Sequence, residues 1–213
     1  MGKLLTEFLG TFFLVLTIAL SVTHAGAMAP LAIGVVLIAM VYMGGHVSGA
    51  HYNPAVSLGA FLTRNMPGRN LVPYMIAQVV GGVAAGAVAL VLTGEHPAPA
   101  PTTADNMAAL LNEILFTFAL VLVVLNVACT PSTRGNSYYG VAIGLTVMAG
   151  AFAGGSISGG AYNPAVGVGL CAIDAIRGGS SLSHVWLYLA GPFVGAILAA
   201  GAFAIQSRPA KAA

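Results

Sequence analysis

The chain has 213 residues, of which 58% are hydrophobic and only 6% are charged, and its formal net charge is +2. A soluble globular domain carries about 25% charged residues, so this composition excludes an ordinary soluble protein and predicts a single integral membrane domain over the whole chain, with the lipid bilayer around it. The small net charge gives no support for a nucleic-acid partner.

Six apolar stretches are long enough, or nearly so, to cross a hydrocarbon core about 30 Å thick. In chain order they are Leu4–Val22, Met28–Tyr42, Leu71–Leu92, Ala108–Ala128, Tyr138–Phe152 and Val185–Ile205. Two shorter apolar stretches, Val56–Leu62 and Val166–Ile173, follow the second and the fifth span. The linker Glu95–Asp105 between the third and fourth spans is too rich in proline for a helix.

One tripeptide occurs twice in matching surroundings. The two copies are Asn53-Pro54-Ala55 and Asn163-Pro164-Ala165. Asparagine is a good helix N-cap, and proline suits the first helical position, where its missing N–H costs nothing. The Gly- and Ser-rich lead-ins, 44–52 and 154–162, permit an unwound backbone. Each copy is therefore expected to begin a short helix after an irregular approach.

The two halves of the chain resemble each other. The sequence around Glu7 matches that around Glu113, and the two Asn-Pro-Ala copies also lie at corresponding places. Three spans per half is an odd number, so the halves must insert with opposite orientation, which predicts an inverted repeat of about 1–94 and about 107–208. The two half-helices then enter from opposite faces and meet at the bilayer midplane.

Charge predicts the orientation. One side of the six-span arrangement receives Lys3, Arg64, Arg69, Arg134, Arg208 and Lys211. The other side receives a single basic residue, Arg177, with Glu95, Asp105 and Asp174. By the positive-inside rule both termini are expected to be cytoplasmic.

The paired Asn-Pro-Ala motifs, their Ser-Gly lead-ins, the acidic residue in spans one and four and the order of the spans resemble the aquaporin (major intrinsic protein) family from end to end. The resemblance implies an all-α membrane protein with six transmembrane helices plus two re-entrant half-helices. It also implies a homotetramer in the cell (inner) membrane, with one pore per subunit. Such a pore passes water and small neutral solutes such as glycerol, urea, hydrogen peroxide or ammonia, excludes ions, and needs no cofactor, metal or enzymatic activity.

The two asparagines are the first candidate site residues. The side-chain oxygen of Asn53 or Asn163 caps its own helix, while the amide NH₂ remains free to donate to a permeating molecule. The helix N-termini behind them each contribute about half a positive charge, which repels cations at the midplane.

Polar residues near the motifs are expected to support the loops. A carboxylate inside a span is costly and usually faces the bundle interior. Glu7 and Glu113 are therefore expected to accept hydrogen bonds from the irregular backbone before each motif. His46 and His51 are expected to hold the first re-entrant loop, and the alternative for His46 is a pH gate at the cytoplasmic mouth.

The resemblance also assigns an outer selectivity constriction to Tyr42, Ala151, Gly160 and Val166. Most members of the family have arginine where this chain has Val166. The chain therefore lacks the usual cation and much side-chain volume at this place, and the constriction is expected to be wider and more apolar than in a water-selective member.

Two further expectations concern function class and packing. The topology alone also permits a secondary transporter, but such carriers need ionisable groups at the midplane, and only Glu7 and Glu113 lie within spans. No nucleophile–base–acid set or metal-ligand spacing indicates an enzyme.

Small residues are expected to let helices cross closely; these are Gly10, Gly81, Gly82, Gly86, Gly191 and Gly195.

Overall fold

The computed structural model describes residues 1–102 and 105–207, and in these ranges the regular structure is helical. The α-helices are α1 (Gly2–His24), α2 (Ala29–Ser48), α3 (Pro54–Leu62), α4 (Gly68–Thr93), α5 (Asn106–Val124), α6 (Tyr139–Ser158), α7 (Pro164–Ile176) and α8 (Val185–Gln206). A short π-helix, Leu125–Cys129, extends α5. Arg208 and Lys211, two of the basic residues used to predict the orientation, lie outside the described residues.

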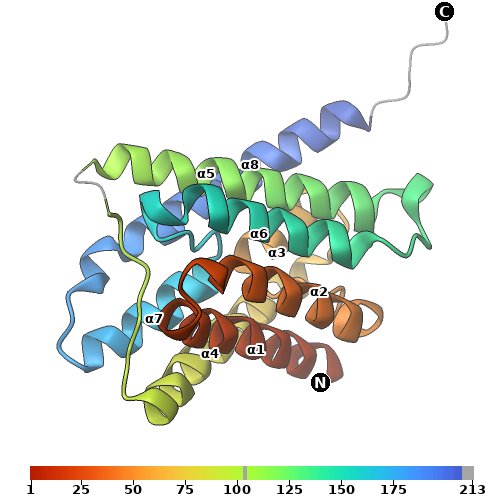
Figure 1. The fold of residues 1–213 in the computed structure, drawn as a ribbon. Helices are drawn as coiled ribbons and strands as arrows, with labels where there is room; N and C mark the ends of the chain where they lie inside the picture. The colour runs from red at the N-terminus through yellow and green to blue at the C-terminus, as the bar shows by residue number, and fades with distance from the viewer. Residues whose placement is uncertain (103–104, 208–213) are drawn as a thin grey trace, which may run out of the picture.

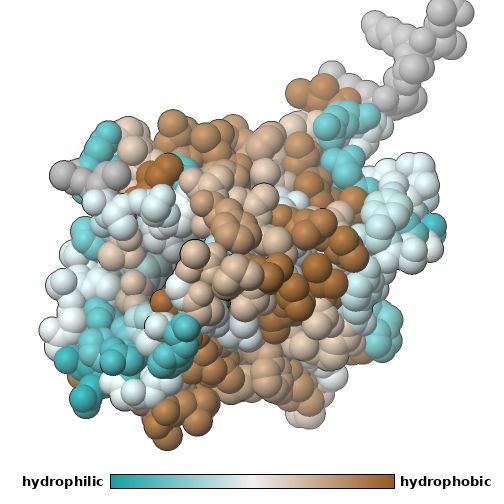
Figure 2. All heavy atoms as spheres, in the orientation of Figure 1, coloured by the Kyte–Doolittle hydropathy of each residue, from teal (hydrophilic) through white to brown (hydrophobic). Residues whose placement is uncertain are grey.

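Six helical segments of 20 to 26 residues in the described ranges are long and apolar enough to cross a membrane, as predicted. Figure 1 shows that α1 begins and α8 ends toward the same side of the bundle; we call this side the terminal end and the opposite side the far end. Figure 2 shows an apolar band across the middle of the molecule, with more polar surface toward both ends. The chain is an integral, multi-pass membrane protein.

Two helices are longer than the apolar runs indicated. The second and fifth spans were expected to end at Tyr42 and Phe152, but α2 continues to Ser48 and α6 to Ser158. The glycine-rich lead-ins are therefore helical over most of their length, because the absence of side chains at these turns makes room for neighbouring groups. Gly44 leaves space for the ring of Tyr52, and the left-handed backbone begins only at the helix C-caps.

The half-helices are held against the spans by close backbone contact. α4 packs on α1 and α7, and α8 packs on α5 and α3. A Cβ atom at Gly82 would overlap the carbonyl oxygen of Ala165 in the second Asn-Pro-Ala motif, and one at Gly81 would lie 2.6 Å from the Phe8 carbonyl oxygen. In the other half, a Cβ atom at Gly195 would lie 2.6 Å from the Ile114 carbonyl oxygen. The expected close crossing at small residues is confirmed at these positions.

Gly82→Ala is expected to lower the stability of the protein by about 1–3 kcal/mol, because a backbone atom cannot move aside as a side-chain tip can. The measurement is thermal unfolding of the purified protein in detergent. Gly201→Ala is the control, since the same substitution in α8 meets nothing within 4 Å. Equal unfolding temperatures for the two variants would show that α4 does not need this close approach to α7.

Candidate functional site

Both Asn-Pro-Ala motifs form helix N-termini. Asn53 Oδ1 accepts a hydrogen bond from the Ala55 N–H at 2.8 Å, and Asn163 Oδ1 accepts one from the Ala165 N–H at 2.9 Å. The proline of each motif occupies the first turn of α3 or α7. These are the caps that the sequence predicts.

The two loops are also bonded to each other. Asn53 Nδ2 donates to the carbonyl oxygen of Tyr162 at 2.9 Å, and Asn163 Nδ2 donates to that of Tyr52 at 2.9 Å. One hydrogen of each amide therefore links the motifs, while the second hydrogen of each NH₂ group is available to a molecule in the adjoining space. Sequence reasoning missed this reciprocal link, because it depends on how the two halves meet.

A buried carboxylate holds the first loop. Glu7 Oε1 accepts hydrogen bonds from Ser48 Oγ at 2.6 Å and from the His51 N–H at 3.0 Å. Its Oε2 accepts from the Tyr52 N–H at 2.8 Å and from Gln78 Nε2 at 2.7 Å. All four acceptor positions of the carboxylate are used, so Glu7 has the predicted structural role.

Glu113 does the same in the second loop. It accepts from Ser158 Oγ at 2.6 Å, from the Ala161 N–H at 3.0 Å and from the Tyr162 N–H at 2.6 Å. Both carboxylates are fully buried. Their bonds hold a strained backbone, because Tyr52 and Tyr162, the residues just before the motifs, have φ values of 50° and 48°. Such conformations persist only where the surroundings enforce them.

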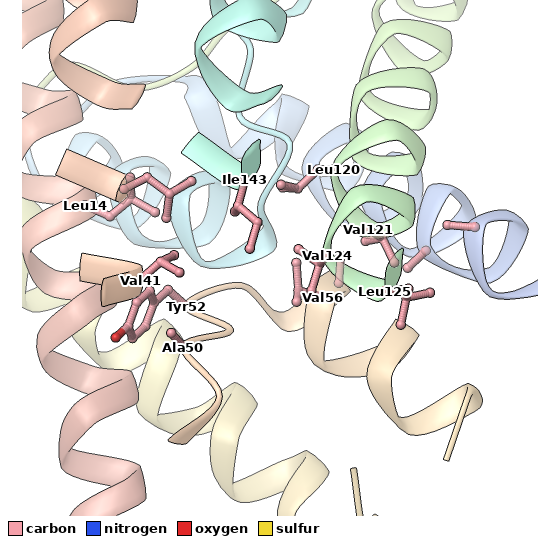
Figure 3. Packing of buried hydrophobic residues seen from close by; sticks show 14 of the residues in the cluster. Leu14, Val41, Ala50, Tyr52, Val56, Leu120, Val121, Val124, Leu125 and Ile143 are labelled. Atoms are coloured by element: carbon pink, nitrogen blue, oxygen red, sulfur yellow. The ribbon is translucent and has the colours of Figure 1, made fainter. Parts of the chain in front are cut away.

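Two cavities adjoin the motifs. The outer cavity, of about 260 Å³, extends from the α1–α2 turn at the far end to Asn53 and Asn163, and both asparagines line it. The inner cavity, of about 640 Å³, opens at the terminal end beside Lys3 and Arg134. Figure 3 shows apolar side chains of α1, α2, α3, α5 and α6 gathered around the interior of the bundle. None of the described residues that line the outer cavity is Asp, Glu, Lys or Arg.

Three of the four predicted constriction residues come together. Ala151, Gly160 and Val166 all line the outer cavity. Tyr42 does not, and its assignment to the constriction is wrong. It lies on the part of α2 near the terminal end, where its hydroxyl donates to the Ser137 carbonyl oxygen at 2.8 Å and its ring contacts Tyr139.

Four other residues of α2, among them Ile33, line the outer cavity. Ile33 precedes Tyr42 by nine residues, or about 13 Å along a helix at 1.5 Å per residue. The signal that could have found it is direction: α2 begins at the far end, so the residue near the outer mouth must lie early in the helix.

The two histidines differ in role. His51 Nδ1 lies 3.0 Å from Ser57 Oγ, and its ring packs edge-on against Tyr74, so His51 supports the first loop as predicted. His46 is exposed and lines the inner cavity, and its ring makes no hydrogen bond to another described residue. The prediction that His46 supports the loop is therefore wrong, because the lead-in is still helical at this residue and turns the ring outward.

The proline-rich linker is fastened across the far end. His96 Nδ1 lies 2.9 Å from Asp174 Oδ1 at the end of α7, and the Thr102 N–H donates to the Ile157 carbonyl oxygen at 3.2 Å. Between these points Pro99 is buried and packs closely on Gly159, which lines the outer cavity. The linker thus buttresses the second re-entrant loop, which its composition alone did not indicate.

The described part of the chain has six helices long and apolar enough to span a membrane and two half-helices whose N-termini meet beside a cavity. This arrangement defines a membrane channel of the inverted-repeat type. The model of the family described as major intrinsic protein matches residues 1–203. The chain therefore belongs to the major intrinsic protein family.

Individual relatives and one solved structure agree. The chain is 38% identical over 211 residues to aquaporin NIP1-4 of Oryza sativa subsp. japonica, covering 94% of this chain and 74% of the relative. It is 36% identical over 212 residues to glycerol uptake facilitator protein-like 6 of Lactiplantibacillus plantarum, covering 94% of this chain and 95% of the relative. The aquaglyceroporin structure from Plasmodium falciparum superposes with a TM-score of 0.84 at 21% identity, covering 93% of each chain, and supports the fold.

The family and the fold together make the chain a passive channel for water and small neutral solutes. A coupled transporter is not favoured. Glu7 and Glu113 accept hydrogen bonds from groups in and around the re-entrant loops, so their carboxylates have a structural role and not that of coupling an ion to transport. The family is one of channels and not of enzymes.

Proposed function

We propose that this channel passes urea and glycerol as well as water. The observation that carries the proposal is the lining of the outer cavity. Ile33, Ala151, Gly160 and Val166 all line this cavity, and none of them supplies a charge or a side-chain hydrogen-bond donor. A pore selects by its diameter and by the groups that line it, so a mouth lined by apolar side chains favours the entry of solutes with a carbon skeleton.

Ion exclusion is assigned to the meeting point of the two half-helices. Because Val166 supplies no cation, the N-termini of α3 and α7, each equivalent to about half a positive charge, provide the main barrier to cations. The amides of Asn53 and Asn163 offer one N–H each to the solute at the same point. The two repeats, about 1–94 and 107–208, thus contribute equally to the pore.

The assembly belongs to the same proposal. We assign the chain to a homotetramer in the lipid bilayer of the cell membrane, with one pore per subunit, as the family resemblance implies. The basic residues Lys3 and Arg134 at the terminal end support a cytoplasmic location of both termini.

The test is stopped-flow light scattering of proteoliposomes under gradients of water, urea and glycerol. We expect the urea and glycerol permeabilities to exceed those of protein-free liposomes about tenfold, which corresponds to a barrier lower by about 1.4 kcal/mol. A protein that accelerates water and neither solute would contradict the proposal, since another group would then have to close the outer mouth.

A further inference from the structure

The two cavities meet at three side chains. His51, Val124 and Ile143 line both the outer and the inner cavity. Val124 is 7% exposed at the end of α5, and Ile143 is 5% exposed on α6. Figure 3 shows both side chains directed into the same interior region. Among the described residues, these three are the ones that the two cavities share, so they stand between the cavities; we call this place the neck.

The internal repeat shows which side chain distinguishes the neck from the corresponding place in the outer half. At the 106-residue offset between Glu7 and Glu113, Val124 corresponds to Ile18. At the 110-residue offset between the two motifs, Ile143 corresponds to Ile33 and His51 to Ala161. These three counterparts all line the outer cavity. The two sets contain similar aliphatic side chains and differ chiefly in His51, which places an imidazole where the outer half has a methyl group.

The neighbours of His51 fix its ring and its polarity. Ser57 Oγ accepts a hydrogen bond from Gln78 Nε2 at 3.0 Å, so its own proton is available for His51 Nδ1 at 3.0 Å. That arrangement puts the ring proton on Nε2, which makes no hydrogen bond to another described residue and lies toward Gly49, in the lining of the inner cavity. The neck is thus lined by the aliphatic side chains of Val124 and Ile143 and by the Nε2–H donor of His51.

We infer that the neck of His51, Val124 and Ile143, and not the outer constriction, is the step that limits the size of the solute. The inference rests on the proposed function, since it assumes that solutes larger than water enter through the outer mouth. A solute with a hydroxyl or carbonyl oxygen meets the His51 N–H on one side and must fit its carbon skeleton between Val124 and Ile143. The neck therefore sets an upper limit on solute width that the outer mouth does not impose.

The test compares erythritol, glycerol and water permeability in proteoliposomes for the wild type, Val124→Ala, Ile143→Ala and the double variant His51→Ala/Ser57→Gly. The double variant gives the first loop the residues that the second loop carries, Ala161 and Gly167. Each variant is expected to raise the erythritol-to-water ratio several-fold. Val123→Ala is the matched control, because Val123 neighbours Val124 on α5 but lines neither cavity, and it should leave the ratio unchanged.

Two results would overturn the inference. If the three neck variants conduct water normally with an unchanged erythritol-to-water ratio, the neck does not limit solute size. If Val147→Ala, which widens only the outer cavity, raises the ratio as much, the limiting step lies in that cavity. These failures differ from failure of the proposed function, in which the wild type itself would conduct water and no glycerol. Ile143→Phe adds an opposite check: it should block glycerol while water still passes.

Discussion

Val166→Arg should reduce urea and glycerol permeability about tenfold while reducing water permeability much less, because pore diameter and lining charge decide which solutes pass. Val166 is 2% exposed, belongs to the same buried cluster as Tyr188 and Ala161, and lines the outer cavity. An arginine there would extend into a space of about 260 Å³ and carry a fixed charge with several N–H donors. The measurement is the solute-to-water permeability ratio at equal protein density.

Val166→Leu separates bulk from charge in this experiment. Leucine adds volume but no charge and no donor, so it should lower solute flux less than arginine does. If the ratio is unchanged in Val166→Arg, Val166 does not line a passage that solutes use. If leucine and arginine act equally, only the width of the mouth matters there.

Glu7→Ala and Glu113→Ala should abolish flux per inserted protein and sharply lower the folded yield. Glu7 accepts four hydrogen bonds and Glu113 accepts three, all from groups in or around the re-entrant loops. Leaving a buried donor without a partner costs about 1–3 kcal/mol, and several are orphaned at once. The total approaches the whole stability of a typical protein, about 5–15 kcal/mol.

Size-exclusion profiles in detergent and water flux in liposomes would measure this effect. Glu113→Gln should fall between the wild type and Glu113→Ala. The amide oxygen can still accept from Ser158 Oγ and the Ala161 N–H, so only the Tyr162 N–H loses its acceptor, whereas alanine leaves all three donors without one. Glu95→Ala, on the exposed linker, is the control and should behave as the wild type. Normal flux through Glu7→Ala or Glu113→Ala would mean that the loops hold their shape without the carboxylates.

Features set by neighbouring residues were predictable from the sequence. The caps at Asn53 and Asn163 follow from local chemistry, and the six spans follow from the length of the apolar runs. The roles of Glu7 and Glu113 were predictable for a different reason. A carboxylate in an apolar span needs donors, and the irregular backbone before each motif supplies them.

Features set by contacts between distant segments were not predictable in this way. The extension of α2 to Ser48 depends on Tyr52 packing into the space at Gly44. Tyr42 lies away from the outer cavity because α2 begins at the far end, so residues late in this helix are near the terminal end. The hydrogen bond between His96 and Asp174 and the reciprocal hydrogen bonds of the two asparagines join segments that are far apart in the chain. No local sequence pattern predicts such contacts.

Flux through this channel is expected to be passive, and the pore is expected to admit solutes larger than water. The most direct measurement is glycerol flux into proteoliposomes with and without an imposed proton or sodium gradient. We predict that glycerol equilibrates at a rate well above that of protein-free liposomes, and that neither gradient changes its final internal concentration. Accumulation of glycerol above the external concentration when either gradient is imposed would contradict the account.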